Sequence, residues 1–305
     1  MNSLSSIEIL EPDSLSDTID FSRPFMPEKL TPFFFTPIYQ TLTDAQRLRY
    51  NQLNALYFNE QTMFFEKTLA QNVLGYFLSQ SLPEELKDGL RQFLAEEKAH
   101  TEMFRQLNRS CAPEFYSRQD FHFIQVPPLA AKILEVVSKH PRQFPFLLWL
   151  MHLQEERAMF FGKVFLKHAG LLEPHFVETQ RKHLADEIGH VRWDESLLDW
   201  IWPKTTAWSR RINSQIFSWM VKEYFTTPKR TAPRIINALV KEFPELQPQR
   251  REFCRQLHAL ENDATYRRSL YSPENVPMTF KRFDAWPEFQ MMTGAMPSYN
   301  RGGNS

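Results

Sequence analysis

The sequence predicts an all-α protein built around a bundle of long helices. Apolar residues recur at helical spacing over most of the chain, and no segment shows the alternation expected of a half-buried β-strand. Only 8 of the 305 residues are glycine. Low glycine content, with no G-x-G-x-x-G or G-x-x-x-x-G-K motif, argues against nucleotide-binding folds that depend on Gly-rich phosphate loops.

Caps and prolines place the individual helices. The first long helix has a Thr or Asp cap at 43–44, and the second starts at Ser81 with Pro83 in its first turn. An N-terminal arm over residues 1–38 precedes a helical domain over 39–275, and an irregular C-terminal tail over 276–305 follows it. The expected helices occupy residues 43–80, 81–110, 128–139, 141–170, 174–202, 206–226, 231–243 and 247–270.

Composition excludes several classes of partner. The chain has 36 basic and 36 acidic residues, so nothing indicates a nucleic-acid or anionic membrane surface. No apolar run approaches the length of about 18 residues that a membrane span needs. The acidic N-terminus lacks the pattern of a signal peptide, and the isolated Cys111 and Cys254 indicate a reducing compartment. We therefore expect a cytoplasmic protein.

The chemistry-bearing pattern is a Glu-x-x-His motif that occurs twice on long helices. The first copy is Glu97 and His100, and the second is Glu187 and His190. Each copy follows a helix with a glutamate inside an apolar run. Glu66 lies 31 residues before Glu97, and Glu156 lies 31 residues before Glu187. Two helix pairs thus offer the same groups at the same separation.

These residue types suit a pair of metal ions. The i, i+3 spacing presents an oxygen and a nitrogen ligand from one helix face, and carboxylates can bridge two ions. Four glutamates and two histidines on four helices are the ligands of ferritin-like di-iron and di-manganese carboxylate proteins. A single Glu-x-x-His is usually a surface pair, but burying these carboxylates without a partner would cost several kcal/mol each. The prediction is a dinuclear site in a ferritin-like bundle with additional C-terminal helices.

Two of the glutamate assignments have alternatives. Glu60 could replace Glu66, but the face of Glu60 also carries Lys67, whereas the neighbours of Glu66 on its face are apolar. Glu155 could replace Glu156, and the equal spacing of 31 residues favours Glu156. We therefore prefer Glu66 and Glu156.

The second motif carries one histidine more than the first. His183 lies one turn before Glu187 on the same helix face, and its counterpart in the first half is Phe93. This position favours a ligand over a structural histidine. The candidate metal ligands are Glu66, Glu97, His100, Glu156, His183, Glu187 and His190.

Residues 35–200, and above all the stretch "HLADEIGH", resemble the di-iron arylamine N-oxygenases typified by p-aminobenzoate N-oxygenase. The resemblance implies that the seven candidates hold two iron ions and that O2 is the co-substrate, reacting through a peroxo di-iron species. It implies N-oxygenation of a small-molecule amine. Related di-iron proteins also imply two outer hydrogen bonds, which pair His100 with Asp186 and His190 with Glu96.

Further expectations follow from the same site. Electrons would come from an external ferredoxin or reductase, since the chain has no flavin or NAD motif. One rival function is a di-iron C–H hydroxylase, desaturase or C–C-cleaving oxidase. The other is a non-catalytic iron store, whose subunits are usually shorter and form cages, whereas a homodimer would be incompatible with a cage. The sequence leaves the substrate and the choice between iron and manganese open.

Overall fold

The computed structural model describes residues 18–227 and 229–299. Within these ranges all regular elements are helical, as the sequence predicts. Residues 1–17 of the expected N-terminal arm, and the last six residues of the expected tail, lie outside the described part of the chain. Among the described helices, none combines the length and the apolar character that a membrane crossing requires.

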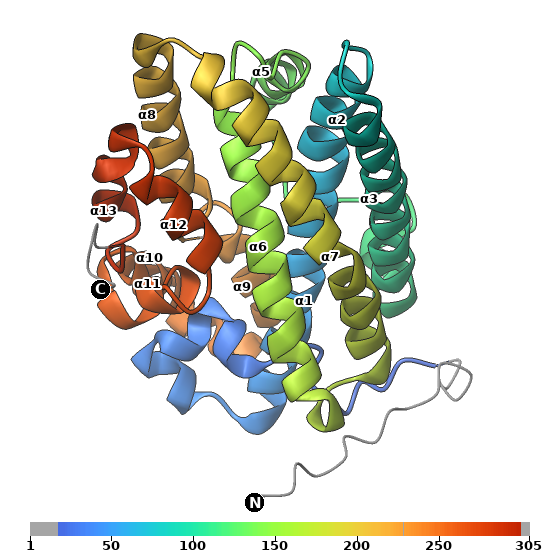
Figure 1. Cartoon of the computed structure of the whole chain (residues 1–305). Coiled ribbons are helices and arrows are strands. Elements are labelled where there is room, and N and C mark those ends of the chain that lie inside the picture. Colours follow the sequence, from blue (N-terminus) through green and yellow to red (C-terminus); the bar gives the residue numbers. More distant parts are fainter. Residues whose placement is uncertain (1–17, 228, 300–305) are drawn as a thin grey trace, which may run out of the picture.

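Four long antiparallel rods form the ferritin-like bundle (Figure 1). The first rod is continuous but consists of two α-helices with a π-helical segment between them. The first rod packs on the second, and the third and fourth pack tightly on each other. The rods are α1 (Asp44–Phe65) with η5 (Glu66–Ala70) and α2 (Gln71–Leu78), then α3 (Glu84–Cys111), α6 (Phe146–Lys167) and α7 (Pro174–Ile201).

Local signals account for the ends of these rods. The Thr43 hydroxyl accepts a hydrogen bond from the Gln46 N–H at 3.3 Å, and the Gln46 side chain accepts one from the Thr43 N–H at 2.9 Å. This capping box starts α1. Glu173 caps α7 through the Phe176 N–H at 3.1 Å, with Pro174 at the first helical position. The π-helical segment was not predicted, since periodicity alone does not distinguish a single inserted residue.

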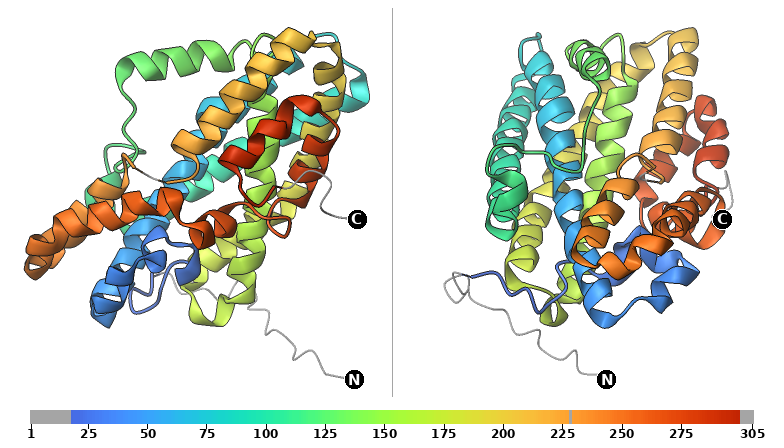
Figure 2. Two further views of the ribbon diagram at one scale, coloured as in Figure 1. Left: turned by 90° about the vertical axis from the view of Figure 1, so that its left-hand side faces the viewer. Right: turned by 180° about the vertical axis from the view of Figure 1, so that it is seen from behind.

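Shorter helices surround the bundle (Figure 2). One of them, α5, lies at the outer edge on a long loop and packs on η5, whereas α8 packs along α6 and α9 packs on α1. They are α4 (Pro113–Tyr116), α5 (Pro128–Ser138), α8 (Ala207–Tyr224), α9 (Ala232–Glu242), α10 (Arg250–Ala259), α11 (Ala264–Leu270), α12 (Pro277–Asp284) and α13 (Met292–Ala295). Short 3-10 turns complete the chain: η2 (Glu28–Leu30), η3 (Pro32–Phe35), η4 (Pro37–Thr41), η6 (Ala169–Leu171), η7 (Trp202–Lys204), η8 (Pro244–Gln249), η9 (Leu260–Asn262) and η10 (Pro287–Met291).

The C-terminal segment differs from the irregular tail expected for residues 276–305. Its described part contains α12, η10 and α13, and lies on the side of α6 away from α3 (Figure 1). Phe283 and Phe289 are fully buried there, with the Phe289 ring 4.2 Å from that of Trp149 on α6. These aromatic contacts with the bundle order the segment, and local sequence does not reveal them.

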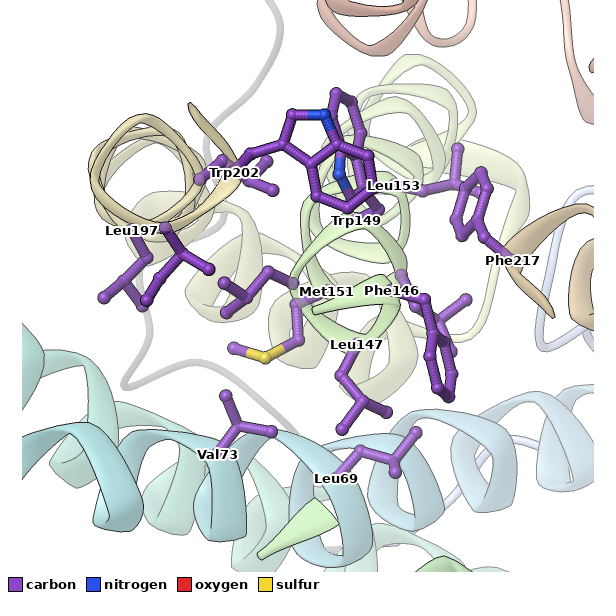
Figure 3. Packing of buried hydrophobic residues seen from close by; sticks show 14 of the residues in the cluster. Leu69, Val73, Phe146, Leu147, Trp149, Met151, Leu153, Leu197, Trp202 and Phe217 are labelled. Carbon is purple, nitrogen blue, oxygen red and sulfur yellow. The ribbon is translucent and has the colours of Figure 1, made fainter. Parts of the chain in front are cut away.

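The apolar core has two parts. The first extends from the rods to α8 and the C-terminal segment, and in it Trp149 and Trp202 pack at 5.3 Å near leucine and phenylalanine side chains (Figure 3). The second joins the N-terminal arm to α1, α9 and α10 through buried aromatics such as Phe25 and Phe33. The polar interior described below belongs to the four rods themselves.

Close packing of α3 against α7 leaves no room for a side chain at one glycine. A Cβ at Gly89 would overlap the indole ring of Trp193, whereas a Cβ at Gly75 in α2 would meet nothing within 4 Å. Gly89→Ala is expected to destabilise the protein by about 1–3 kcal/mol through overpacking. Gly75→Ala is the matched control and should stabilise it by about 0.4–1 kcal/mol. Chemical denaturation of both variants tests this, and equal effects would contradict it.

Candidate metal centre

The interior of the four rods contains a cluster of seven buried ionisable side chains. Each rod contributes at least one of them, and each of these residues is at most 4% exposed. Four are carboxylates and three are imidazoles. The members are Glu66 on η5, Glu97 and His100 on α3, Glu155 on α6, and His183, Glu187 and His190 on α7.

The ligand atoms form two adjoining groups. In the first, Glu97, His100, Glu187 and His190 each offer an atom within 4.8 Å of the others. In the second, Glu66, His100 and His183 do the same. Glu187 Oε1 lies 2.8 Å from His183 Nε2 and 3.5 Å from His190 Nδ1, so Glu187 reaches both groups.

Glu155 completes the first group from the opposite side. Its Oε2 atom lies 3.7 Å from His190 Nδ1, and the Oε1 atom of Glu97 lies 3.3 Å from the same nitrogen. At the other end of the cluster, His183 Nε2 lies 3.3 Å from Glu66 Oε1. Oxygen and nitrogen donors therefore meet at two neighbouring positions in the bundle.

Several of the atoms that could bind a metal ion have no hydrogen-bond partner outside the cluster. Both oxygens of Glu97 and of Glu187, Oε1 of Glu66, and Nδ1 of His100 and His190 are buried and have no hydrogen-bond partner outside the cluster. Leaving one buried polar group unpaired costs about 1–3 kcal/mol, so folded proteins rarely tolerate it. Unpaired donors directed at a common space, with a carboxylate and imidazole composition, fit a pair of transition-metal ions.

Two outer hydrogen bonds fix the orientation of the imidazoles. His100 Nε2 lies 2.9 Å from Asp186 Oδ2, and His190 Nε2 lies 3.0 Å from Glu96 Oε2. Both pairs cross between α3 and α7 and are those that the sequence analysis pairs. Because each outer bond occupies Nε2, each ring turns Nδ1 toward the cluster. Phe93 stacks on the His190 ring at 4.0 Å and holds it from the side.

Thr101 belongs to the site and was not predicted. Its hydroxyl lies 3.1 Å from Glu66 Oε2 and 2.9 Å from the carbonyl oxygen of Glu97, so it links η5 to α3 beside the cluster. Gln71 Nε2 donates to the same hydroxyl oxygen at 3.2 Å. The only sequence signal is that Thr101 lies one turn after Glu97 on the same helix face.

The sequence analysis prefers Glu156 as the α6 ligand, but the structure corrects this preference. The α6 carboxylate that lies in the cluster is that of Glu155. Glu156 accepts the backbone N–H groups of Met278 at 2.6 Å and Thr279 at 2.8 Å, at the start of α12. Equal spacing along the chain failed as a criterion because the connections between the paired rods differ in length. Glu156 is satisfied by a segment that lies 122 residues away.

Glu60 also lies outside the cluster, although it is fully buried. It accepts a hydrogen bond from the Tyr116 hydroxyl at 2.7 Å and from the backbone N–H groups of His122 and Ile124 at 2.8 and 2.7 Å. These bonds fasten the loop before α5 to α1. Glu66 is therefore the α1–α2 rod's carboxylate in the cluster.

The metal-free cluster compensates its negative charge with protons. Burial, together with the adjacent Glu66 carboxylate, raises the pKa of the Glu97 carboxyl well above its ordinary value. Burial disfavours a charged imidazole, but the Glu187 and Glu66 carboxylates outweigh it and raise the pKa of His183 to about 10. The carboxylates around His190 likewise outweigh burial and raise its pKa to about 12. Both side chains are therefore in the charged imidazolium form at neutral pH, with a proton on each ring nitrogen.

Fe(II) binding is expected to release protons and to weaken as the pH falls. The pKa values of His183 and His190 lie above neutral pH, so an incoming ion must displace a proton from each. For each proton that must be displaced, the apparent affinity falls by up to about tenfold when the pH is lowered by one unit. Anaerobic calorimetry in two buffers of different ionisation enthalpy measures the release. An affinity independent of pH between about 6 and 8 would contradict the expected competition.

Removing an outer carboxylate should weaken metal binding without removing a ligand. Asp186→Ala frees His100, and Glu96→Ala frees His190, so each variant is expected to bind Fe(II) about 10–100-fold more weakly. Asp88→Ala, which removes an exposed acid from the same helix α3, is the control and should bind as the wild type does. Anaerobic titration checks this, and unchanged affinity in both site variants would argue against the orienting role.

Comparison with known proteins places the chain in a family. The family model described as P-aminobenzoate N-oxygenase AurF matches residues 11–263, which include the seven clustered side chains. No curated protein sequence matches the chain significantly. Because the match covers most of the chain, the protein belongs to the P-aminobenzoate N-oxygenase AurF family, a family of di-iron ferritin-like oxygenases.

Proposed function

We propose that the protein is a di-iron oxygenase that uses O2 to N-oxygenate a small-molecule amine. The observation that carries the proposal is the seven-residue cluster, in which His183 is added to four glutamates and two further histidines. The family match over the same helices supports an N-oxygenase reaction.

The residues of each group can be assigned to one ion. Glu97, Glu155 and His190 would hold the first, and Glu66 and His183 the second, with His100 and Glu187 within reach of both. Four carboxylates balance the charge of two divalent ions, which a buried site requires. When bound, the iron ions supply the redox chemistry of O2 activation.

The protein side of the site provides orientation and excludes water. Thr101 restrains Glu66, and the outer carboxylates restrain His100 and His190. Phe93 and Phe104 are fully buried, and the Phe104 ring packs 5.1 Å from that of His183. A dry, preorganised site strengthens electrostatic interactions with the reacting groups and suppresses side reactions with water.

The proposal extends to the surroundings of the enzyme. An external ferredoxin or reductase would supply electrons, because the chain carries no flavin or NAD motif. The free thiols Cys111 and Cys254 suit a reducing cytoplasm, which remains our prediction. We propose a homodimer rather than a cage, and size-exclusion chromatography distinguishes the two.

Turnover of an amine panel tests the reaction. The iron-loaded, reduced protein is exposed to O2 with arylamines and alkylamines, and products are identified by mass spectrometry. Hydroxylamine, nitroso or nitro products are expected. Hydroxylated or cleaved carbon products would instead favour another oxygenase reaction, and iron uptake into a cage without turnover would favour an iron store.

His183→Ala separates the site's role from general damage to α7. The variant is expected to lose at least about tenfold of the N-oxygenation rate, because it removes one nitrogen donor from the Glu66 end of the cluster. His175→Ala is the control. His175 lies on the same helix but outside the cluster, and its Nδ1 atom is 2.7 Å from Glu173 Oε1. Equal activity of the two variants would remove His183 from the proposed ligands.

A further inference from the structure

Glu156 is a buried carboxylate whose partner is the C-terminal segment. Its side chain is 3% exposed and accepts the backbone N–H groups of Met278 and Thr279 at 2.6 and 2.8 Å. These groups belong to the first turn of α12, after Pro277, which has no N–H to offer. The first turn of a helix carries unpaired donors and a partial positive charge, so a carboxylate there is favourable.

The same short helix is attached to α7. Arg282 Nε lies 2.9 Å from Glu195 Oε1, and Arg282 Nη1 lies 2.9 Å from Asp199 Oδ1. The next residue, Phe283, anchors α12 in the core beside Trp149 of α6, at 5.7 Å between ring centroids. Helix α12 thus connects α6 and α7, the two rods that carry Glu155, Glu187 and His190 (Figure 1).

The attachment bears on which glutamate of α6 faces the cluster. Adjacent residues on an α-helix point about 100° apart, so a rotation of α6 by that angle would exchange Glu155 and Glu156. Either side chain has the chemistry of a ligand, and the sequence does not distinguish them. The bonds that Glu156 accepts from α12, together with the packing of Trp149, hold α6 against the rotated alternative.

We propose that Glu156 is a positioning residue: by holding the N-terminus of α12 it fixes the rotation of α6 and so selects Glu155 as the glutamate of the metal centre. The proposal rests on the metal centre proposed above. It also gives the C-terminal segment a role in the site, although α12 begins after residue 263, where the family match ends.

Anaerobic Fe(II) titration of two neighbouring variants tests the assignment. Glu155→Gln is expected to lose tight binding of one of two ions, because it removes a ligand. Glu156→Gln is expected to keep both ions but to bind them about 10–100-fold more weakly, with altered Mössbauer parameters, because it releases one N–H bond to α12 and loosens α6. The reverse pattern, or wild-type affinity and spectrum in Glu156→Gln, would overturn the proposal.

A matched control separates positioning from loss of stability. Glu173 is also a fully buried glutamate that accepts a backbone N–H, at the start of α7, but it lies outside the cluster. Glu173→Gln is expected to lower the melting temperature while leaving the Fe(II) affinity unchanged. If it weakened iron binding as much as Glu156→Gln does, the effect would be general and the proposal would fail.

A substitution in α12 tests the same proposal without changing residue 156. Met278→Pro removes one of the two N–H donors in the first helical turn, where no intrahelical bond is lost, and leaves Glu156 intact. A folded Met278→Pro protein should also bind both ions more weakly, and unchanged affinity would overturn the proposal even if Glu156→Gln does not fold.

The titration uses neither amine nor O2, so its outcome is separate from that of the proposed reaction. A wild-type protein that binds two ions but N-oxygenates no amine would overturn only the reaction. A wild-type protein that binds no iron would overturn the metal centre and this proposal with it.

Discussion

Four carboxylates and three imidazoles, enclosed by four helices and nearly without solvent contact, set the constraint on which the rest of the structure depends. Such a group is unfavourable unless positive charge accompanies it. In the metal-free protein, protons on His183 and His190 provide that charge. Two divalent ions would provide it more completely, because they would also satisfy the unpaired oxygens of Glu97 and Glu187. The packing of the rods therefore depends on whether protons or metal ions compensate the charge of the cluster.

Buried glutamates perform two different tasks in this fold, and their hydrogen bonds distinguish them. The oxygens of Glu97 and Glu187 have polar neighbours only within the cluster, where an ion can take the place of the imidazole protons. Glu60, Glu156 and Glu173 instead accept backbone N–H groups from segments outside the four rods or at a rod's end. Glu60 and Glu156 each fasten an irregular or short segment to the bundle, and Glu173 caps α7. The accessory parts of the chain are thus attached by the same residue type that forms the centre.

Both tasks occur on the first rod, before the π-helical segment or at its first residue. Glu60 serves the loop before α5, and Glu66 begins η5 and enters the cluster. A π-turn adds one residue to the helical repeat and re-aims the side chains that follow, which is why such turns often occur at functional sites. Thr101 then ties Glu66 to α3. One hydroxyl thus restrains the carboxylate of Glu66, and the π-helical segment that begins there re-aims the residues after it.

The amino-acid sequence by itself determined the rods and most of the centre. Helical periodicity and caps such as Thr43 depend on neighbours within one turn, so they were readable, as were the two Glu-x-x-His motifs and the extra His183. The tertiary structure alone decided between Glu155 and Glu156, ordered residues 276–299 and added Thr101 to the site. Each of these choices rests on contacts between segments far apart in the chain. Adjacent glutamates on a helix are locally equivalent, and only the segments that pack against the helix make them different.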